Sequence, residues 1–355
     1  MTQPFPFYAG QRSDKTFSRG NVLSPLPVKT QIPPTQSDDS VISKTDSYLE
    51  LGGYGGLVFQ SQMMWTHFLL GLIVFLLLYS AGGGISGLYH AMYKEELIDG
   101  QWVNKIQYME LLAGSMMYLA GPLLWTLPLR AIYQTRKALS QVLPFRFHRQ
   151  RREVMMSRWN RKTQQTEIRF FPWESVCAMV GEGSAVGAGA VMSGGNLLIA
   201  ANDEDEPGYF WSSKQIGAQD LIHATAKWEM IRRFMEDGPQ AIGKPQLVTF
   251  QGMIEEYCQQ KQIAVQDFPN GIRWWWYLNG RLIGLWRINR ARKRQSRLVD
   301  SFPEVAEWSQ PLPESEWAQP SRELQAMNHI LTENEYAQGL TILNVGDLRE
   351  KYGSP

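Results

Sequence analysis

The sequence predicts an α+β membrane protein: a two-helix transmembrane hairpin followed by a cytoplasmic β-rich domain that one helix closes. Two apolar stretches, at 64–84 and 111–129, each have about the 20 apolar residues that a helix needs to cross a bilayer. Short β-prone segments follow from residue 145, and an amphipathic helical pattern follows them. The mean hydropathy of -0.29 is too low for a polytopic transporter, so most of the chain should lie outside the lipid.

Residues 1–50 are expected to form a flexible lead to the hairpin. Pro25, Pro27, Pro33 and Pro34 and a polar run at 35–40 interrupt both helical and strand periodicity. The first 20 residues lack the apolar core and the small-residue cleavage site of a signal peptide. The first internal span would therefore serve as an uncleaved membrane anchor.

The transmembrane hairpin is expected within residues 51–137. In the first span, Trp65 and Tyr79 stand where interfacial aromatic residues anchor a helix, and the glycines at 82–84 would end it. The second span is less apolar and contains Gly121 and Pro122. Glycine and proline are tolerated in membrane helices when a neighbouring helix covers them, so the second span should pack against the first.

Basic residues set the expected orientation of the hairpin. Arg130, Arg136 and Lys137 follow the second span, and a further basic cluster lies at 146–162. The loop between the spans is short and slightly acidic, with a turn signal at Asp99-Gly100. By the positive-inside rule, both termini should be cytoplasmic and only this loop should lie outside. The basic cluster could also bind anionic lipid.

Residues 145–240 are expected to form the β-rich domain. Strand-like segments at 153–159, 167–173, 176–180 and 197–201 precede a helix. An apolar stripe at spacings of three and four predicts that helix, and it consists of Leu221, Ala224, Trp228, Ile231 and Met235. Several strands closed by one helix resemble pleckstrin-homology-like folds, an analogy that carries no function by itself.

The C-terminal region, 241–355, contains an unusual tryptophan-rich and arginine-rich segment. With Asn279-Gly280 at a turn, residues 272–288 could form a β-hairpin. The preferred alternative is a helix lying in the membrane interface, because aromatic and basic residues both favour that layer. The candidates for contact with the membrane or a partner are Trp274, Trp275, Trp276, Trp286, Arg287, Arg290, Arg292, Lys293 and Arg294. The tail from Pro303 should wrap the domain.

No sequence motif indicates catalysis, and we expect neither an enzyme nor a protein with a metal or cofactor. The five histidines lack metal-site spacing, and the glycine-rich segment 181–195 departs from phosphate-binding patterns. Cys177 stands in a predicted strand, as a buried small residue would, and Asp203 is expected in a solvated turn. The net charge of +1 gives no reason to expect nucleic acid. The expected partners are the lipid bilayer and another protein, with the oligomeric state open.

Three stretches carry a resemblance: NRKTQQTEIRFFPWESVCAMV, KWEMIRRFMEDGP and FPEVAEWSQPLPESEW. Across residues 145–321 the chain resembles an uncharacterised bacterial domain family found near type VI secretion genes. The resemblance implies a protein of the bacterial inner membrane that is linked to interbacterial toxin delivery. With the two spans it would be a multi-pass protein, and a membrane hairpin favours an immunity protein against a membrane-active effector. The alternatives are a membrane-anchored scaffold or effector accessory that binds lipid or a partner protein and, less favoured, a membrane-damaging effector. The family supplies no catalytic residues.

Overall fold

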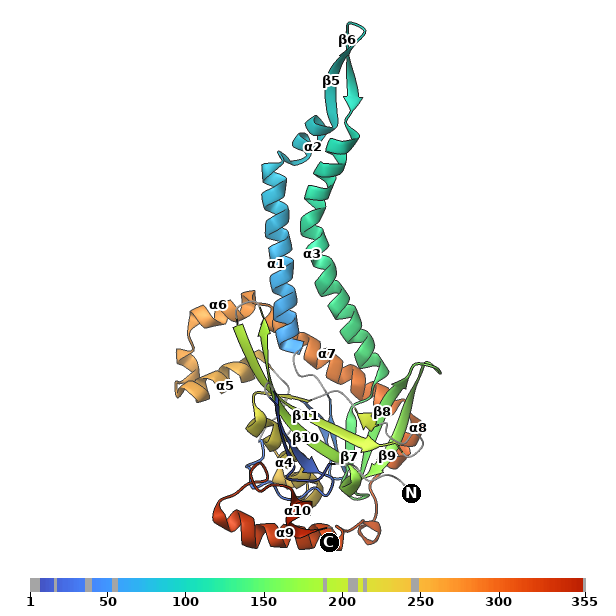
Figure 1. The fold of residues 1–355 in the computed structure, drawn as a ribbon, viewed down its shortest axis with the longest axis vertical. Helices are drawn as coiled ribbons and strands as arrows, with labels where there is room; N and C mark the ends of the chain where they lie inside the picture. Colours follow the sequence, from blue (N-terminus) through green and yellow to red (C-terminus); the bar gives the residue numbers. More distant parts are fainter. Residues whose placement is uncertain are drawn as a thin grey trace. The chain divides into compact units, whose positions relative to one another are not determined.

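The structure, a computed structural model, describes residues 7–15, 18–35, 40–52, 57–187, 190–203, 210–212, 216–243 and 249–353. It combines helices with β-sheets, as the expected α+β class requires (Figure 1). The chain forms two compact units. Unit 1 consists of Met1–Gly56, Leu139–Thr249 and Ile288–Pro355, and unit 2 consists of Leu57–Ala138 and Phe250–Arg287.

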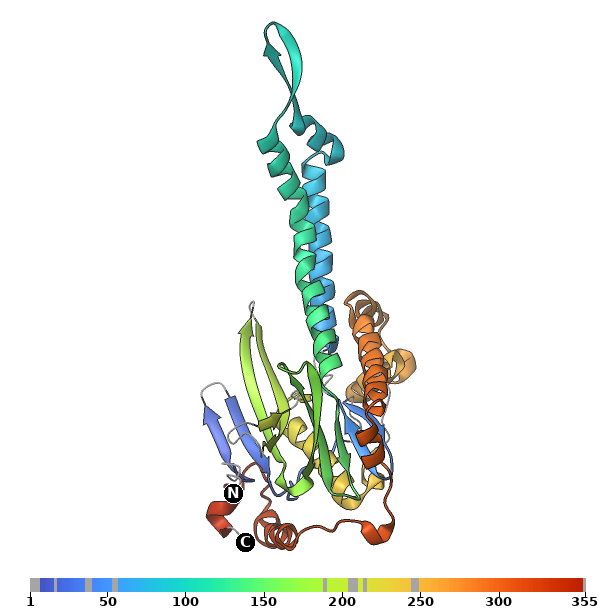
Figure 2. The same ribbon diagram turned by 90° about the vertical axis from the view of Figure 1, so that its right-hand side faces the viewer.

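Unit 1 contains two antiparallel sheets (Figure 2). The first has the order β1 (Arg12–Lys15), β2 (Ser18–Ser24), β10 (Cys177–Gly187), β11 (Ala190–Asn202) and β12 (Phe210–Ser212), and β13 (Ile216–Ala218) also pairs with β11. The second has the order β3 (Val41–Lys44), β4 (Tyr48–Leu51), β7 (Phe145–His148), β8 (Glu153–Asn160) and β9 (Gln165–Pro172). Each sheet therefore joins strands from before and after the apolar hairpin.

The expectation of a flexible lead at 1–50 is wrong for the described residues of that range. They form four strands, and Leu23 and Val28 are fully buried in the main core. The Thr30 hydroxyl donates to a Glu229 carboxylate oxygen at 2.9 Å, which fixes the proline-rich link. These strands are too short to show a clear periodicity of their own, and two of them, β2 and β4, pair with β10 and β7, which lie far away in the sequence.

In the second sheet, the whole apolar hairpin connects two neighbouring strands, β4 and β7. The chain leaves the sheet at Leu51, the last residue of β4, and returns at Phe145, the first residue of β7. These two residues are register partners in an antiparallel strand pair. The whole hairpin is thus an insertion between two neighbouring strands, and both of its ends start from the same place in unit 1.

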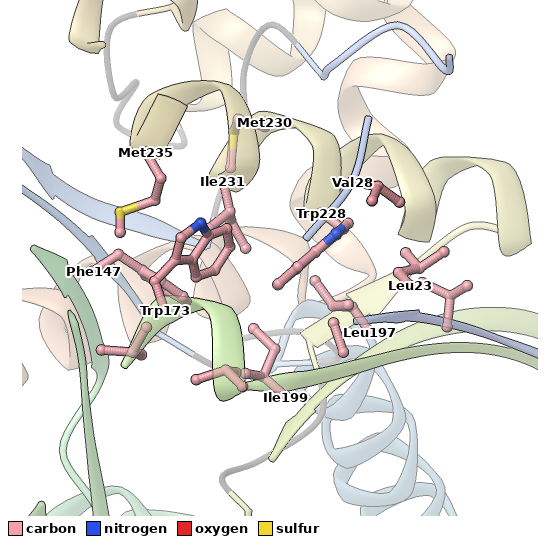
Figure 3. Packing of buried hydrophobic residues seen from close by; sticks show 14 of the residues in the cluster. Leu23, Val28, Phe147, Trp173, Leu197, Ile199, Trp228, Met230, Ile231 and Met235 are labelled. Atoms are coloured by element: carbon pink, nitrogen blue, oxygen red, sulfur yellow. The ribbon is translucent and has the colours of Figure 1, made fainter. Parts of the chain in front are cut away.

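Helix α4 (Leu221–Asp237) lies in the middle of unit 1. Its Asp220 cap accepts a hydrogen bond from the His223 backbone N–H. Figure 3 shows the α4 side chains facing those of both sheets in one core. The stripe residues Ala224, Trp228, Ile231 and Met235 are buried, as the periodicity predicts.

The opposite face of α4 is also covered, which the sequence pattern did not indicate. Glu229 and Arg232 do not belong to the apolar stripe, yet each is 3% exposed, and they form an ion pair of 2.6 Å. The N-terminal segment around Thr30 and the C-terminal segment that contains Tyr336 help to cover this face of α4. Because chain segments distant in sequence enclose the helix, its own periodicity could not reveal the second buried face.

The C-terminal region completes unit 1 with α8 (Pro303–Trp308), α9 (Arg322–Ile330) and α10 (Leu348–Tyr352). Trp308 packs in a smaller cluster with Leu143, Met155 and Val305. The end of the chain joins the main core through Leu324, Met327, Leu331, Ile342, Val345 and Leu348. The core of this unit therefore needs both its first and its last segments.

Unit 2 contains α1 (Leu57–Ala81), α2 (Gly84–Met92), β5 (Tyr93–Ile98), β6 (Gln101–Ile106), α3 (Tyr108–Gln141), α5 (Phe250–Lys261), α6 (Asn270–Leu278) and the start of α7 (Arg281–Asp300). Helix α1 ends just before the glycines at 82–84. Helix α3 continues through Pro122 and Pro128. At 1.5 Å per residue, α1 and α3 are about 37 and 51 Å long, which exceeds the roughly 30 Å of a bilayer's hydrocarbon core.

Candidate membrane-binding site

Helices α1 and α3 have the length and composition to cross a membrane, and their apolar side chains face outward. In the most apolar 18-residue stretch of each helix, only 11% (α1) and 12% (α3) is buried. On α1, Ile73 is 53% and Leu77 is 64% exposed, and on α3, Leu123 is 58% exposed. A core helix of a soluble protein would bury such side chains, whereas a large exposed apolar surface is typical of a membrane or protein contact.

The two helices meet at a contact between glycines. A Cβ added to Gly121 would lie 2.5 Å from the carbonyl oxygen of Gly71, so neither position has room for a larger residue. One turn further along α3, Trp125 donates from Nε1 to the Phe68 carbonyl oxygen at 3.0 Å. Close approach through small residues is a common way for helices to pack in lipid, where no hydrophobic force drives them together.

Side-chain hydrogen bonds hold the hairpin at both ends. Near the α1–α2 turn, the Tyr118 hydroxyl donates to the carbonyl oxygen of Gly84 at 2.9 Å. At the other end, Gln60 donates from Nε2 to the Thr135 hydroxyl at 2.8 Å. In a low-dielectric surrounding, such bonds fix the register of two helices.

Between α2 and α3, the segment expected as a loop forms a β-hairpin. Its turn residues Asp99 and Gly100 both have positive φ (52° and 82°), which is the signature of the tight two-residue turn that Asp-Gly favours. Leu97 and Trp102 face each other across the strands and are 58% and 69% exposed. The sequence showed the turn, and the residues flanking Asp-Gly were the signal that could have revealed the strands.

The tryptophan-rich segment is helical, so the β-hairpin alternative for 272–288 is wrong. Residues Asn279 and Gly280 join α6 to α7, and Gly280 has φ +77° at the end of α6. Trp274, Trp275 and Trp286 are 67%, 64% and 60% exposed.

Trp276 lies inside a small aromatic core of α5 and α6, and it is only 7% exposed. Its ring centroid is 5.2 Å from that of Phe268, and the Arg281 guanidinium stacks on it at 4.5 Å. Trp276 therefore anchors the helical segment and offers no surface to a membrane.

The basic candidates also divide into surface and interior residues. Arg290, Lys293 and Arg294 are exposed on α7. Arg292 is 5% exposed and donates from Nη2 to the backbone carbonyl of Val41. Arg287 is half-buried and contacts α1. Trp276 and Arg292 are thus structural, and seven of the nine candidate residues remain accessible in whole or in part.

Two residues of unit 1 that could have carried chemistry are structural as well. Asp203, expected in a solvated turn, is 3% exposed and accepts hydrogen bonds from Arg158 at 2.6 Å, Arg169 at 3.0 Å and Trp211 at 2.8 Å. Burial raises the pKa of the Cys177 thiol to about 12, which keeps it protonated and unreactive. Across the residues that the structure describes, no group of three or more potential metal ligands comes together.

Comparisons of the chain with protein-family models, curated protein sequences and solved structures find no match.

Proposed function

We propose that this is a multi-pass protein of the bacterial inner membrane that acts by binding, with α1 and α3 as its transmembrane hairpin. The observation that carries the proposal is the outward-facing apolar surface of the two helices. Only 11% of the most apolar 18-residue stretch of α1, and 12% of that of α3, is buried. Covering that surface with lipid removes it from water, which stabilises by roughly 25 cal/mol for each Å².

The strand pairing in unit 1 supports two crossings rather than one. Because Leu51 and Phe145 are paired in one sheet, the inserted hairpin must begin and end on the same side of the membrane. A single crossing would separate β4 from β7. The proposed hairpin, with one crossing by α1 and one by α3, meets this requirement.

Charge supports the proposed orientation, in which unit 1 and both termini are cytoplasmic. Arg130, Arg136 and Lys137 follow the apolar part of α3. On the other side of the hairpin, Lys105 pairs with Glu96 at 3.0 Å and Lys94 pairs with Glu110. Excess basic residues mark the cytoplasmic side. Unit 1, with strands closed by α4, would serve as a pleckstrin-homology-like interaction domain.

The favoured role is immunity against a membrane-active effector delivered by type VI secretion, as the family resemblance implies. Such an effector would approach the inner membrane from outside, where the proposed topology presents the β5–β6 hairpin. Its exposed Leu97 and Trp102 give it an apolar contact surface, and aromatic residues dominate the binding energy of many protein interfaces.

The test is protection of cells that express the effector encoded beside this gene. Cells that also contain the wild-type protein should survive, and the double variant Leu97→Ala, Trp102→Ala should reduce the number of surviving cells by roughly tenfold. Ile222→Ala, which removes an exposed apolar side chain from unit 1, should protect like the wild type. Death of cells whose membranes contain the wild-type protein would exclude immunity.

The second candidate role is a membrane-anchored scaffold or effector accessory, and the exposed Trp274, Trp275 and Trp286 favour it. These side chains could bind lipid or a partner protein. A membrane-damaging effector is the third candidate. Expression of the protein alone would then depolarise cells, whereas an immunity protein or a scaffold leaves the membrane potential unchanged.

A further inference from the structure

The first turns of α7 pack tightly on the beginning of α1. A Cβ added to Gly280 would lie 2.6 Å from the Trp65 side chain, and one added to Gly284 would lie 2.7 Å from the Val58 backbone. Trp65 donates from Nε1 to the Leu278 carbonyl oxygen at 2.6 Å. These contacts within unit 2 hold the tryptophan-rich helices at one fixed level along α1.

That level is where a short polar stretch of α1 ends and its long apolar run begins. Gln60, Ser61 and Gln62 precede the long apolar run, and Trp65 is the first aromatic residue of the proposed span. In a spanning helix, such a border lies in the headgroup layer of the bilayer. The tryptophan-rich helices are therefore attached to α1 at the depth of lipid headgroups.

Arg287 reaches α1 at this level and finds only neutral acceptors. Its Nη1 donates to the Ser61 hydroxyl at 2.7 Å and to the Met64 sulfur at 3.6 Å, and its Nη2 donates to Gln60 Oε1 at 2.8 Å. Among the described residues, no carboxylate lies within ion-pair distance of this guanidinium. Burial alone lowers the Arg287 pKa, without a nearby negative charge to offset it.

The neighbouring surface is aromatic and exposed. Trp286 precedes Arg287 and is 60% exposed, and on α6 Trp274, Trp275 and Leu278 are 67%, 64% and 62% exposed. Exposed tryptophan next to an uncompensated arginine is the composition of an interfacial membrane site, because indole favours the headgroup layer and guanidinium binds phosphate in two parallel hydrogen bonds.

Resting on the proposed transmembrane hairpin, we propose that Arg287 binds the phosphate of an anionic phospholipid at the cytoplasmic end of α1, while the Trp274, Trp275 and Trp286 side chains lie in the interface around it. Ser61 and Gln60 orient the guanidinium toward the headgroup. The ligand is a lipid of the surrounding bilayer, so it reaches the site by lateral diffusion.

Native mass spectrometry of the full-length protein, released from detergent with added lipid, tests the site. The wild type should retain phosphatidylglycerol more strongly than phosphatidylcholine. Arg287→Gln should weaken the apparent affinity for phosphatidylglycerol about fivefold, the effect expected of one basic residue near a lipid surface. Lys261→Gln removes the same charge from an exposed position at the end of α5 and should leave the preference unchanged. Millimolar inorganic phosphate should not displace the lipid.

Equal binding of the two lipids by the wild type, or an unchanged preference in Arg287→Gln, would overturn the headgroup site. Arg287→Lys keeps the charge and should keep most of the preference, so it reports on the site even if Arg287→Gln folds poorly. Resistance to carbonate extraction tests the transmembrane hairpin independently of the lipid site at Arg287. Membranes should retain Arg287→Gln as they retain the wild type, and extraction of the wild type would refute both.

Quenching by lipids brominated along their acyl chains tests the aromatic part. The double variant Trp274→Phe, Trp275→Phe should lose part of the quenched fluorescence of the wild type, because those indoles contact lipid. Trp308→Phe removes a tryptophan that is 9% exposed in unit 1, and it should leave the quenched component unchanged. An unchanged quenched component in the double variant would contradict interfacial placement of α6.

Discussion

His148 is fully buried in the second sheet, and its hydrogen bonds fix it in the neutral form. Its Nδ1 accepts from the Arg151 backbone N–H at 3.3 Å, so the proton must be on Nε2, which donates to the Gln310 carbonyl oxygen at 3.2 Å. Burial, assisted by the charge of Arg151 and opposed by the hydrogen bond to the Gln310 carbonyl, lowers the pKa of His148 to about 4. A second proton would have to face a backbone N–H that already points at Nδ1.

This arrangement predicts that the protein loses stability in mild acid. The His148 pKa is near 6.5 when unfolded and about 4 when folded, so its contribution is complete above pH 6.5 and falls as the pH drops toward 4. At pH 5 the loss should be about 2 kcal/mol. Thermal unfolding of the detergent-solubilised protein at pH 7 and pH 5 measures it. His148→Gln should lose less stability between pH 7 and pH 5 than the wild type does. His223→Gln, a control at an exposed position, should lose as much as the wild type.

The sequence drew attention to the tryptophans and arginines of the tryptophan-rich segment but did not indicate which of them reach the surface. Trp274, Trp275 and Trp276 are adjacent and chemically identical, yet only Trp276 is buried. Its burial depends on the phase of α6 and on Phe268 and Tyr257, which belong to other elements. The interior position of Arg292 similarly depends on Val41, far away in the sequence.

Among the elements, those with a strong local signal were predictable. An apolar run of bilayer length encodes its own helix, and the glycines at 82–84 encode its end. The periodicity of α4 encodes the helix and one buried face. Strands β1 to β4 are short, and β2 and β4 are ordered by pairing with β10 and β7, so no local sequence pattern predicted them. The contact between Gly71 and Gly121 follows from helix packing, which the small residues of the second span suggested.

The contact between Gly71 and Gly121 predicts that two substitutions on α3 differ strongly in their effect on stability. Gly121→Val should destabilise the hairpin by about 1–3 kcal/mol, because the new side chain would overlap the Gly71 carbonyl and Phe75. Ala113→Val adds volume at an exposed position of the same helix and should be nearly neutral. Thermal unfolding in detergent and resistance of the hairpin to protease would compare them. Equal stability of the two variants would contradict the close approach of the helices.

On the scale of the whole molecule, each unit is assembled from separate stretches of chain. The sequence suggested consecutive domains, because composition changes along the chain from apolar to β-prone to tryptophan-rich. In the structure, α5, α6 and the start of α7 share a unit with the hairpin, and the N-terminal strands share one with the C-terminal tail. Such regrouping depends on non-local pairing, which a change in composition does not reveal.

The proposed topology predicts opposite labelling of two introduced thiols. Cys177 and Cys258 are buried and should give little background. In intact spheroplasts, a membrane-impermeant maleimide should label Gln101→Cys, which lies in the β5–β6 hairpin. Ser315→Cys, exposed in unit 1, should be labelled only after lysis. Labelling of both thiols, or of Ser315→Cys alone, before lysis would refute the proposed orientation.

The interrupted second sheet has a consequence for the order of events during synthesis. Leu23 leaves the ribosome early, but Ile342 and Val345, which share its core, emerge last. The proposed membrane segments end by residue 141, and the next 200 or so residues take roughly 10–40 s to translate. The hairpin can therefore insert before the C-terminal residues that complete the core of unit 1 have been made. Unit 1 then folds afterwards, on a chain already anchored at the membrane surface.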